Sequence, residues 1–222
     1  HDLSFQAAPG QIIGVTGPVA CGKSTIGKTF LCESPYEGSI TFGGRELGKM
    51  EKTDRNRIIG YLGHDPELWN DTVEANVLCG DEGDAMQWLK MTALDDEVRA
   101  MEQGLQTVVG SSGVRLCGGQ AQRLALARTL AHPRPVLVLD DPFSALDRGT
   151  EDAVFARLKE YAKDKVVLLI SHRLYHFPEM KRVIFMADGA VTIGTHAQLC
   201  EKVPAYRSLY ESQTGGANYE AK

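Results

Sequence analysis

The sequence predicts an α/β fold in which helices cover a mostly parallel β-sheet. Three short runs rich in valine, isoleucine and leucine alternate with helical patterns along most of the chain. Such runs are typical of strands buried on both faces, and the alternation is typical of a parallel sheet with crossover helices. We expect strands at residues 11–16, 135–139 and 166–170, and helices at residues 23–32, 120–131 and 151–162.

Three regions interrupt this alternation. Residues 38–42 and 58–62 look like antiparallel strands, and we expect them to form an antiparallel β subdomain. Residues 71–101 are acidic and helical in pattern, which predicts an inserted α-helical subdomain. Residues 182–195 contain an Asp-Gly pair between two strand-like segments, which is a strong hairpin signal.

These patterns divide the chain into two lobes within one domain of residues 1–213. We expect a core lobe at about residues 1–63 and 119–213, a helical lobe at about residues 71–118 and a disordered tail at residues 214–222.

The composition excludes several classes of protein. A chain with 43% hydrophobic and 24% charged residues is expected to fold around a core, which excludes a disordered protein. The net charge of −5 argues against a strongly basic nucleic-acid surface. The longest apolar runs are far shorter than the ~20 residues that cross a bilayer. The five cysteines show no C-x-x-C pair and no zinc spacing, so we expect reduced thiols.

A phosphate-binding loop is predicted between the first strand and the first helix, because the chain there matches G-x-x-x-x-G-K-[ST]. We expect ATP to contact the loop and the residue after it: Gly17, Pro18, Val19, Ala20, Cys21, Gly22, Lys23, Ser24 and Thr25. Backbone N–H groups of such a loop bind phosphates, Lys23 would reach the β- and γ-phosphates, and the Ser24 hydroxyl would ligate Mg²⁺. The pattern therefore predicts a phosphate-loop NTPase core. A glycine-containing turn that binds nothing is the alternative.

Two carboxylates follow the second apolar strand. The run VLVL leads directly into Asp140 and Asp141, so both are expected at the sheet edge where the phosphate loop lies. Asp140 would hold Mg²⁺ through water, as the second acidic element of the nucleotide site. Asp141 would face the attacking water as a general base or a positioning group. Two solvated acids at the end of a strand are the alternative.

A third group of motifs gives the chain a resemblance to a known family. A signature is formed by five residues: Leu116, Cys117, Gly118, Gly119 and Gln120. One helix later the acidic strand leads into SALD, which ends at Asp147, and His172 follows a further apolar strand. In this order the motifs resemble the ATP-binding cassette family from about residue 1 to about residue 213.

The resemblance implies a composite nucleotide site. In that family two such domains meet head to tail, and each signature closes over the ATP held by the other domain. The signature residues and Asp147 are therefore expected to take part in nucleotide binding, and His172 matches the family's switch histidine. Independently of the family, two adjacent glycines at a helix start expose backbone N–H groups that can bind an anion. A plain loop before a helix is the alternative.

The resemblance also implies partners and a location. The ending at residues 194–213 is of the exporter type, and such endings accompany transmembrane halves fused ahead of the ATPase. We therefore expect a second nucleotide-binding domain and a transmembrane domain as partners, no nucleic acid, and a place at the cytoplasmic face of the cell membrane for a fragment that is itself soluble. Residues 1–5 look like half of an opening hairpin without its first strand and adenine-stacking aromatic residue, as in a piece of a longer polypeptide. The transported solute and the choice between homodimer and heterodimer stay open.

Several substitutions depart from the family pattern. Asp141 stands in place of the catalytic glutamate, which withdraws the carboxylate by about 1.5 Å and predicts slow hydrolysis. His64 replaces a glutamine whose oxygen contacts Mg²⁺, and imidazole is a poor Mg²⁺ ligand. A surface histidine is the alternative for His64. Cys117 replaces the signature serine. Together, Asp141 and Cys21 resemble the first nucleotide-binding domain of the multidrug-resistance-associated subfamily.

Two hypotheses lead. In the first, the chain is an ATPase that drives a membrane exporter, with Asp141, His172 and His64 as catalytic residues. In the second, it is a nucleotide-dependent dimerisation module of a heterodimeric transporter and scarcely hydrolyses ATP. A chromosome-maintenance or DNA-repair ATPase is disfavoured because the long coiled-coil insertion of that class is missing. A simple phosphate-loop kinase would not need the signature or the SALD sequence.

Overall fold

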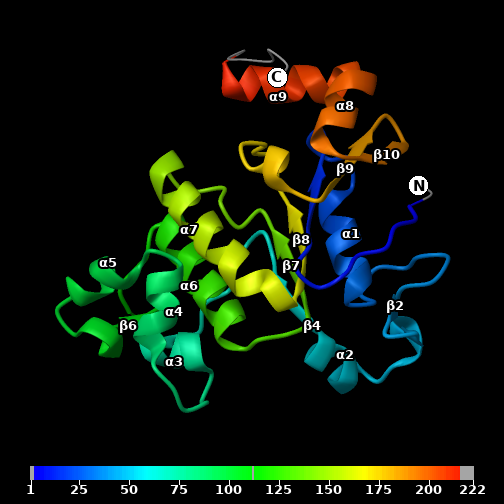
Figure 1. The fold of residues 1–222 in the computed structure, drawn as a ribbon. Coiled ribbons are helices and arrows are strands. Elements are labelled where there is room, and N and C mark those ends of the chain that lie inside the picture. The colour runs from blue at the N-terminus through cyan, green and yellow to red at the C-terminus, as the bar shows by residue number, and fades with distance from the viewer. Residues whose placement is uncertain (1–2, 112, 216–222) are drawn as a thin grey trace.

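A six-stranded sheet runs through the centre of the molecule, and helices cover both of its faces (Figure 1). The computed structural model describes residues 3–111 and 113–215. The strand order is β10-β9-β1-β8-β7-β4, and every neighbouring pair is parallel except β9 with β10. The strands are β1 (Ile12–Thr16), β4 (Ile59–Leu62), β7 (Val136–Asp140), β8 (Val166–Ile170), β9 (Arg182–Ala187) and β10 (Ala190–Gly194).

The central strands are buried on both faces, as the apolar runs predict. Every residue of β1 and of β7 is buried. Successive side chains point to opposite faces, so Leu137 and Leu139 join one hydrophobic core while Val138 joins the other. The three predicted strands are confirmed, with bounds that shift by one residue at most.

The three predicted helices are α1 (Lys23–Phe30), α6 (Gly118–Ala131) and α7 (Arg148–Tyr161). Helix α7 begins before the predicted residue 151 because Asp147 caps it. The Asp147 carboxylate accepts a hydrogen bond from the Thr150 N–H at 3.0 Å. Helix α1 ends before the predicted residue 32, because Cys32 has a φ of 55°, in the left-handed region that a right-handed helix cannot adopt.

The predicted pairing of residues 38–42 with residues 58–62 is wrong. Strand β2 (Thr41–Phe42) pairs with β3 (Arg45–Glu46), and β4 joins the central sheet parallel to β7. Two glycines connect β2 to β3, with φ values of 55° at Gly43 and 78° at Gly44. Positive φ at both central residues is what a two-residue hairpin turn requires, so the chain closes locally instead of reaching forward to β4.

Residues 71–101 are mainly helical, as predicted. They contain β5 (Asp71–Thr72), α3 (Val73–Leu78), α4 (Ala85–Met91) and α5 (Asp95–Arg99). Strand β5 pairs with β6 (Val108–Val109) in a small antiparallel sheet. These helices pack on one side of α6 around a third hydrophobic core, at the end of the molecule away from the last two helices (Figure 1).

The hairpin at residues 182–195 is confirmed as β9 and β10, and its turn residues Asp188 and Gly189 have φ values of 50° and 76°. Leu3 to Phe5 form no strand, and the rest of the expected opening hairpin, like residues 216–222 of the expected tail, lies outside the described residues. The remaining helices are α2 (Lys52–Ile58), α8 (His196–Lys202), α9 (Pro204–Thr214) and four short 3₁₀ turns, η1 (Leu47–Lys49), η2 (Gly104–Gln106), η3 (Ala162–Asp164) and η4 (Phe177–Glu179). None of the helices in residues 3–111 and 113–215 has the length and apolar character needed to cross a membrane.

Candidate nucleotide-binding site

Four neighbouring strands carry the predicted site residues at their carboxyl ends. The phosphate loop follows β1, His172 follows β8, Asp141 follows β7 and His64 follows β4. These strands are adjacent in the order β1-β8-β7-β4 and are all parallel. Their carboxyl ends therefore meet at one edge of the sheet, where ligands of open α/β sheets bind.

The phosphate loop has a backbone shape that needs its glycines. Gly17 has a φ of 154°, and a Cβ added there would lie 2.0 Å from the Met186 carbonyl oxygen. Gly22 caps the start of α1 in the left-handed conformation, with a φ of 95°. A side chain at Gly17 would collide with β9, and one at Gly22 would strain the turn. The two glycines thus keep a compact cradle of backbone N–H groups at the helix start.

The Lys23 ammonium group lies over this loop. Its Nζ donates hydrogen bonds to the carbonyl oxygens of Gly17, at 2.9 Å, and Pro18, at 2.7 Å. The Cys21 sulfur lies 3.7 Å from the same nitrogen. The Val19 side chain is 93% exposed and contributes nothing to the interior of the loop. A cation and the loop N–H groups thus share one concave surface, which fits a phosphate chain.

Asp140 has the environment of a metal-binding carboxylate. It ends β7 and is only 3% exposed. Burial raises the pKa of Asp140, while a side-chain hydrogen bond with Ser24 and the nearby His64 and Lys23 oppose the rise. Ser24 and Asp140 therefore offer two adjacent oxygen atoms of the kind that Mg²⁺ prefers, so the residues fit the predicted metal. Within the part of the chain that the structure describes, no cluster of three or more His, Cys, Asp or Glu residues suits a metal held by protein alone.

Asp141 brings the three predicted catalytic residues together. Its Oδ2 atom lies 2.8 Å from Nδ1 of His172 and 3.6 Å from Nδ1 of His64. The Ser171 hydroxyl donates a hydrogen bond to the other carboxylate oxygen, at 3.3 Å. Asp141 itself is almost fully buried, whereas more than half of each imidazole side chain is exposed. The carboxylate is therefore held from within while both rings face the open edge of the sheet.

The backbone of Asp141 is held as firmly as its side chain. Asp141 adopts a φ of 54°, and its N–H donates to the Ile170 carbonyl at 2.7 Å. Its own carbonyl accepts a hydrogen bond from the buried Gln122 amide, at 3.3 Å. Neither Gln122 nor Ser171 was among the predicted site residues. The buried position of Gln122 on α6 becomes apparent only once the sheet has assembled.

The signature residues form the start of α6. The Cys117 N–H donates to the Gln120 side-chain oxygen at 2.9 Å, and the Gln120 amide donates to Glu97 at 2.8 Å. A Cβ on Gly119 would lie 2.8 Å from the Ala145 carbonyl oxygen, so no side chain fits at that position. A Cβ on Gly118 would meet nothing within 4 Å. Gly118 therefore presents its backbone to an open surface.

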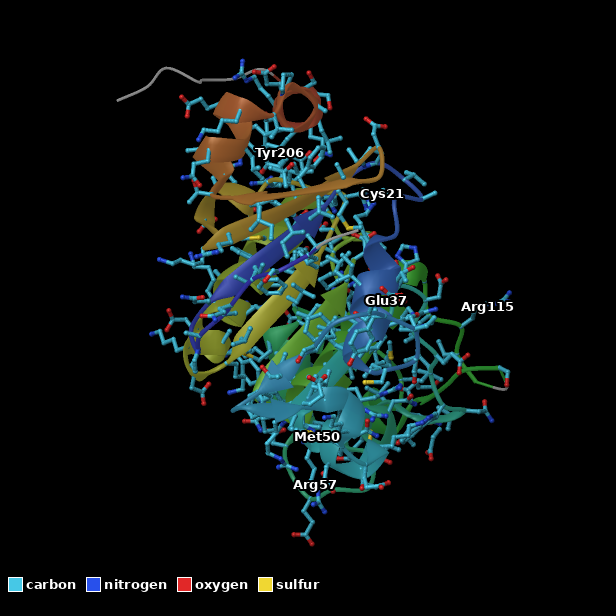
Figure 2. The ribbon with its side chains drawn as sticks, turned by 90° about the vertical axis from the view of Figure 1, so that its right-hand side faces the viewer. Cys21, Glu37, Met50, Arg57, Arg115 and Tyr206 are labelled. Atoms are coloured by element: carbon cyan, nitrogen blue, oxygen red, sulfur yellow. The ribbon has the colours of Figure 1, made fainter. Side chains whose placement is uncertain are left out.

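Two predicted nucleotide contacts are not assembled within this one chain. Asp147 caps α7, and its carboxylate also accepts a hydrogen bond from the Thr150 hydroxyl at 2.6 Å. These hydrogen bonds lower the pKa of Asp147 and occupy both carboxylate oxygens. Arg115, directly before the signature, lies well apart from Cys21 of the phosphate loop in Figure 2. The Asp147 carboxylate is thus engaged at the start of α7, and Arg115 beside the signature lies away from the chain's own phosphate loop.

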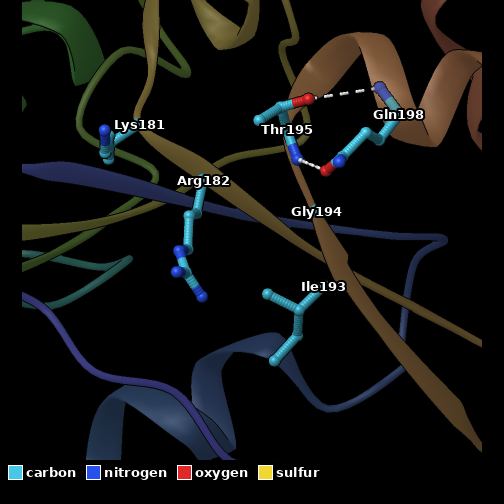
Figure 3. Close-up of a pocket in the computed structure, with 6 residues that line it drawn as sticks. All are labelled: Lys181, Arg182, Ile193, Gly194, Thr195 and Gln198. Atoms are coloured by element: carbon cyan, nitrogen blue, oxygen red, sulfur yellow. Dashed lines mark hydrogen bonds between the residues drawn. The ribbon is translucent and has the colours of Figure 1, made fainter.

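A cavity lies at the other end of the strands. Its volume is about 370 Å³, and it is lined by Lys181, Arg182, Ile193, Gly194, Thr195 and Gln198 (Figure 3). Strand β9 begins at Arg182 and runs parallel to β1, so this is the amino end of the strands. Thr195 and Gln198 form a capping box there, in which the side-chain oxygen of each residue accepts a hydrogen bond from the backbone N–H of the other. This cavity is therefore separate from the phosphate-loop edge.

Comparisons with known proteins agree with this geometry. Residues 1–144 match the family model described as ABC transporter. The chain is 33% identical over 227 residues to "ABC transporter ATM1" of Toxoplasma gondii, covering 99% of this chain and 20% of that protein. It is 36% identical over 220 residues to an "ATP-dependent lipid A-core flippase" of Vibrio parahaemolyticus, covering 96% of this chain and 38% of that protein.

A solved structure gives the same result. It is titled "Structure of a bacterial Atm1-family ABC exporter with ATP bound", and it matches with a TM-score of 0.89 and 30% identity over 96% of this chain and 39% of that chain. The chain thus spans between 20% and 39% of the length of these relatives. The motifs meet at one edge of the sheet, and the family model and these relatives match the chain. The chain therefore belongs to the ABC transporter family, as an ATP-binding domain of the exporter type.

Proposed function

We propose that this chain binds Mg·ATP and hydrolyses it slowly, and that dimer closure driven by ATP is coupled to transport of a solute across a membrane. The observation that carries the proposal is the meeting of the phosphate loop, Asp140, Asp141 and His172 at one edge of the sheet. Binding and hydrolysis need these groups together, since catalysis of phosphoryl transfer is mostly positioning and electrostatics.

The predicted binding residues divide into two groups. Within this chain, ATP would contact Gly17, Pro18, Val19, Ala20, Cys21, Gly22, Lys23, Ser24 and Thr25. Lys23 would exchange its two carbonyl partners for phosphate oxygens, which are stronger acceptors because they are charged. Ser24 and Asp140 would hold Mg²⁺, which supplies positive charge beside the phosphates when it is bound.

The proposed hydrolytic group is centred on Asp141. Its carboxylate would orient the attacking water, and His172 would donate a hydrogen bond from its ring toward the γ-phosphate. Asp141 is one carbon–carbon bond, about 1.5 Å, shorter than glutamate. It also shares its carboxylate with His172, His64 and Ser171. A short and heavily engaged carboxylate positions water poorly, which supports slow hydrolysis.

A second copy or a related domain would complete the site. The helical lobe at about residues 71–118 would present the signature to the partner's ATP, through Leu116, Cys117, Gly118, Gly119 and Gln120, with Asp147 nearby. The open surface at Gly118 supports this, because backbone N–H groups at a helix start attract phosphate. The core lobe, about residues 1–63 and 119–213, would hold the chain's own nucleotide.

A transmembrane domain is the other proposed partner, which would place the chain at the cytoplasmic face of the membrane. A groove of about 230 Å³ lies between the end of β4 and the side of α6, and Asp65, Glu67 and Arg128 are among its lining residues. The groove adjoins His64, so a partner seated there would lie next to the Asp141 cluster.

The alternative is a dimerisation module that binds ATP and closes, but scarcely hydrolyses it. The observation that favours it is that three side chains already contact the Asp141 carboxylate, so few of its hydrogen-bonding positions are left for water. Both proposals require ATP binding and closure. They differ in turnover alone.

Cysteine crosslinking tests the proposed closure, because the chain has free thiols in both motifs, Cys21 and the exposed Cys117. A short bismaleimide added to the assembled transporter should link Cys117 to the partner's phosphate loop with ATP present, and not with ADP. In a homodimer, Cys21 of the second copy would be the second thiol. For a heterodimer, a cysteine would be introduced at the matching position of the partner. Cys117→Ser is the matched control. Links that form only within one chain would contradict head-to-tail closure.

A further inference from the structure

The last helix of the described chain is tied to the segment that carries His172. The Gln213 side-chain amide donates a hydrogen bond to the His172 carbonyl oxygen at 2.6 Å. Its side-chain oxygen accepts a hydrogen bond from the Leu174 N–H at 2.9 Å. One side chain of α9 therefore holds the backbone on both sides of Arg173. Gln213 is the last residue of the exporter-type ending at residues 194–213, and no role of its own was predicted for it.

The position of Gln213 follows from how α9 is anchored. Tyr206, Leu209, Tyr210 and Gln213 recur at the spacing of one helix face. Tyr206 is fully buried, its ring packs edge-on against Phe185, and its hydroxyl lies 2.7 Å from Nδ1 of His196. The same face that fixes α9 to the sheet thus carries an amide in its last turn. That amide is directed at the segment after β8.

The segment after β8 depends on such side-chain partners. Residues 172–174 form neither helix nor strand, and the N–H of Arg173, like that of Leu174, donates its hydrogen bond to a side chain, the Ser171 hydroxyl. Leu174 is fully buried, and Gln213 is the acceptor for its N–H. Arg173 is held separately, since its guanidinium donates to the carbonyl oxygens of Phe143, at 2.7 Å, and Leu146, at 2.6 Å. Gln213 therefore holds backbone groups of His172 and Leu174, whereas the Arg173 side chain holds the segment to other backbone groups.

We propose that Gln213 is a positioning residue for hydrolysis, which acts by fixing the backbone of His172 so that its imidazole stays on Asp141. The inference rests on the proposed function. His172 Nδ1 lies 2.8 Å from the Asp141 carboxylate, so a small shift of the His172 backbone breaks that contact. Rates of phosphoryl transfer respond steeply to displacements of this size. The Gln213 side chain hydrogen-bonds the backbone of His172 and Leu174, so it would work through His172.

The test compares variants of Gln213 in the assembled transporter. Gln213→Met keeps the side-chain length and removes both hydrogen bonds, and we expect single-turnover hydrolysis to slow about tenfold while the Kd for Mg·ATP stays within about twofold. Gln213→Glu keeps the acceptor for Leu174 but turns a carboxylate oxygen toward the His172 carbonyl oxygen, and two acceptors repel, so its rate should be no higher than that of Gln213→Met. Glu211→Gln, on the exposed side of the same helix, is the matched control and should leave the rate unchanged.

A second background separates positioning from general stability. In a His172→Ala protein the ring is absent, so Gln213→Met should have no further effect on the rate. An equal slowing in both backgrounds, or no slowing in the native background, would overturn the proposal. Failure of the native protein to bind Mg·ATP any better than Lys23→Ala would be a different result, because it would remove the proposed function itself, and this inference with it.

Discussion

The phosphate loop and the Asp141 cluster lie at the same edge of the sheet and are built in opposite ways. The loop is one short stretch of chain, Gly17 to Ser24, whose shape comes from two glycines and the start of α1. The cluster takes Asp141, His64 and His172 from the ends of three different strands. The loop is therefore local in sequence, and the cluster exists only in the assembled sheet.

This difference explains which substitutions the site can tolerate. Phosphate binding by backbone N–H groups does not depend on the side chains of Ala20 or Cys21, so we expect the loop to bind phosphate with these unusual residues. The cluster depends on side-chain length and on contacts of 2.8 Å and 3.6 Å to one carboxylate. We infer that the binding half of the site is intact and the hydrolytic half is weakened.

The largest expected effect is at the loop. Lys23→Ala should weaken Mg·ATP binding by about a hundredfold or more, since a charged donor to the phosphates is lost. Titration calorimetry measures this directly. Lys28→Ala, in the last turn of the same helix, is the matched control and should bind as the native protein does. Unchanged affinity in Lys23→Ala would refute the assignment of the loop.

A smaller effect is expected at His64. His64→Gln removes an imidazole that lies 3.6 Å from Asp141 and supplies an oxygen ligand of the kind that Mg²⁺ prefers. We expect turnover to rise about threefold, less than a change at Asp141 itself would give. His132→Gln, at the end of α6, controls for the loss of a histidine. A fall in turnover would show that His64 assists hydrolysis as it stands.

The smallest effect is a change in stability at Asp140. Burial raises the pKa of Asp140 in the folded protein, so the folded state binds the proton more tightly than the unfolded chain does. Its contribution to stability is complete below the unfolded pKa of about 3.9 and is lost as pH rises through the folded pKa. The ionised Asp140 therefore destabilises the protein at pH 7.

Asp140→Asn should consequently raise the melting temperature at pH 7 without nucleotide or Mg²⁺, by about 2 °C, while it weakens Mg·ATP binding. The gain should shrink as pH falls toward the unfolded pKa. Asp54→Asn, at a half-exposed carboxylate on α2, should change neither property. A lower melting temperature in Asp140→Asn would mean that the hydrogen bond with Ser24 outweighs the cost of burial.

Local patterns predicted much of the fold. The phosphate loop, the central strands and the β9–β10 hairpin follow from apolar runs, glycines and turn residues that act over a few residues. The wrong pairing of β4 arose because Gly43-Gly44 already closes β2 onto β3, a local turn signal that outweighs a distant apolar run.

Contacts across the fold could not be predicted in this way. Gln122 on α6 and Gln213 on α9 hydrogen-bond the backbone of Asp141 and His172, and nothing in the sequence around either glutamine marks that partner. A buried amide has no spacing signature, since its partner is a backbone group brought close only by the assembled sheet. The candidate site residues could thus be chosen from the sequence, whereas the contacts that hold them in place could not be predicted from it.

Replacing Asp141 by glutamate tests the central claim, that binding is intact and the short carboxylate limits hydrolysis. Single-site turnover and the Kd for Mg·ATP should be measured together in the assembled transporter, for the native protein, Asp141→Glu and a control with the same change at a half-exposed position, Asp54→Glu. We predict that Asp141→Glu raises turnover about tenfold with affinity within about twofold of the native value, because the added methylene carries the carboxylate to the attacking water. Unchanged turnover with unchanged affinity would contradict the account.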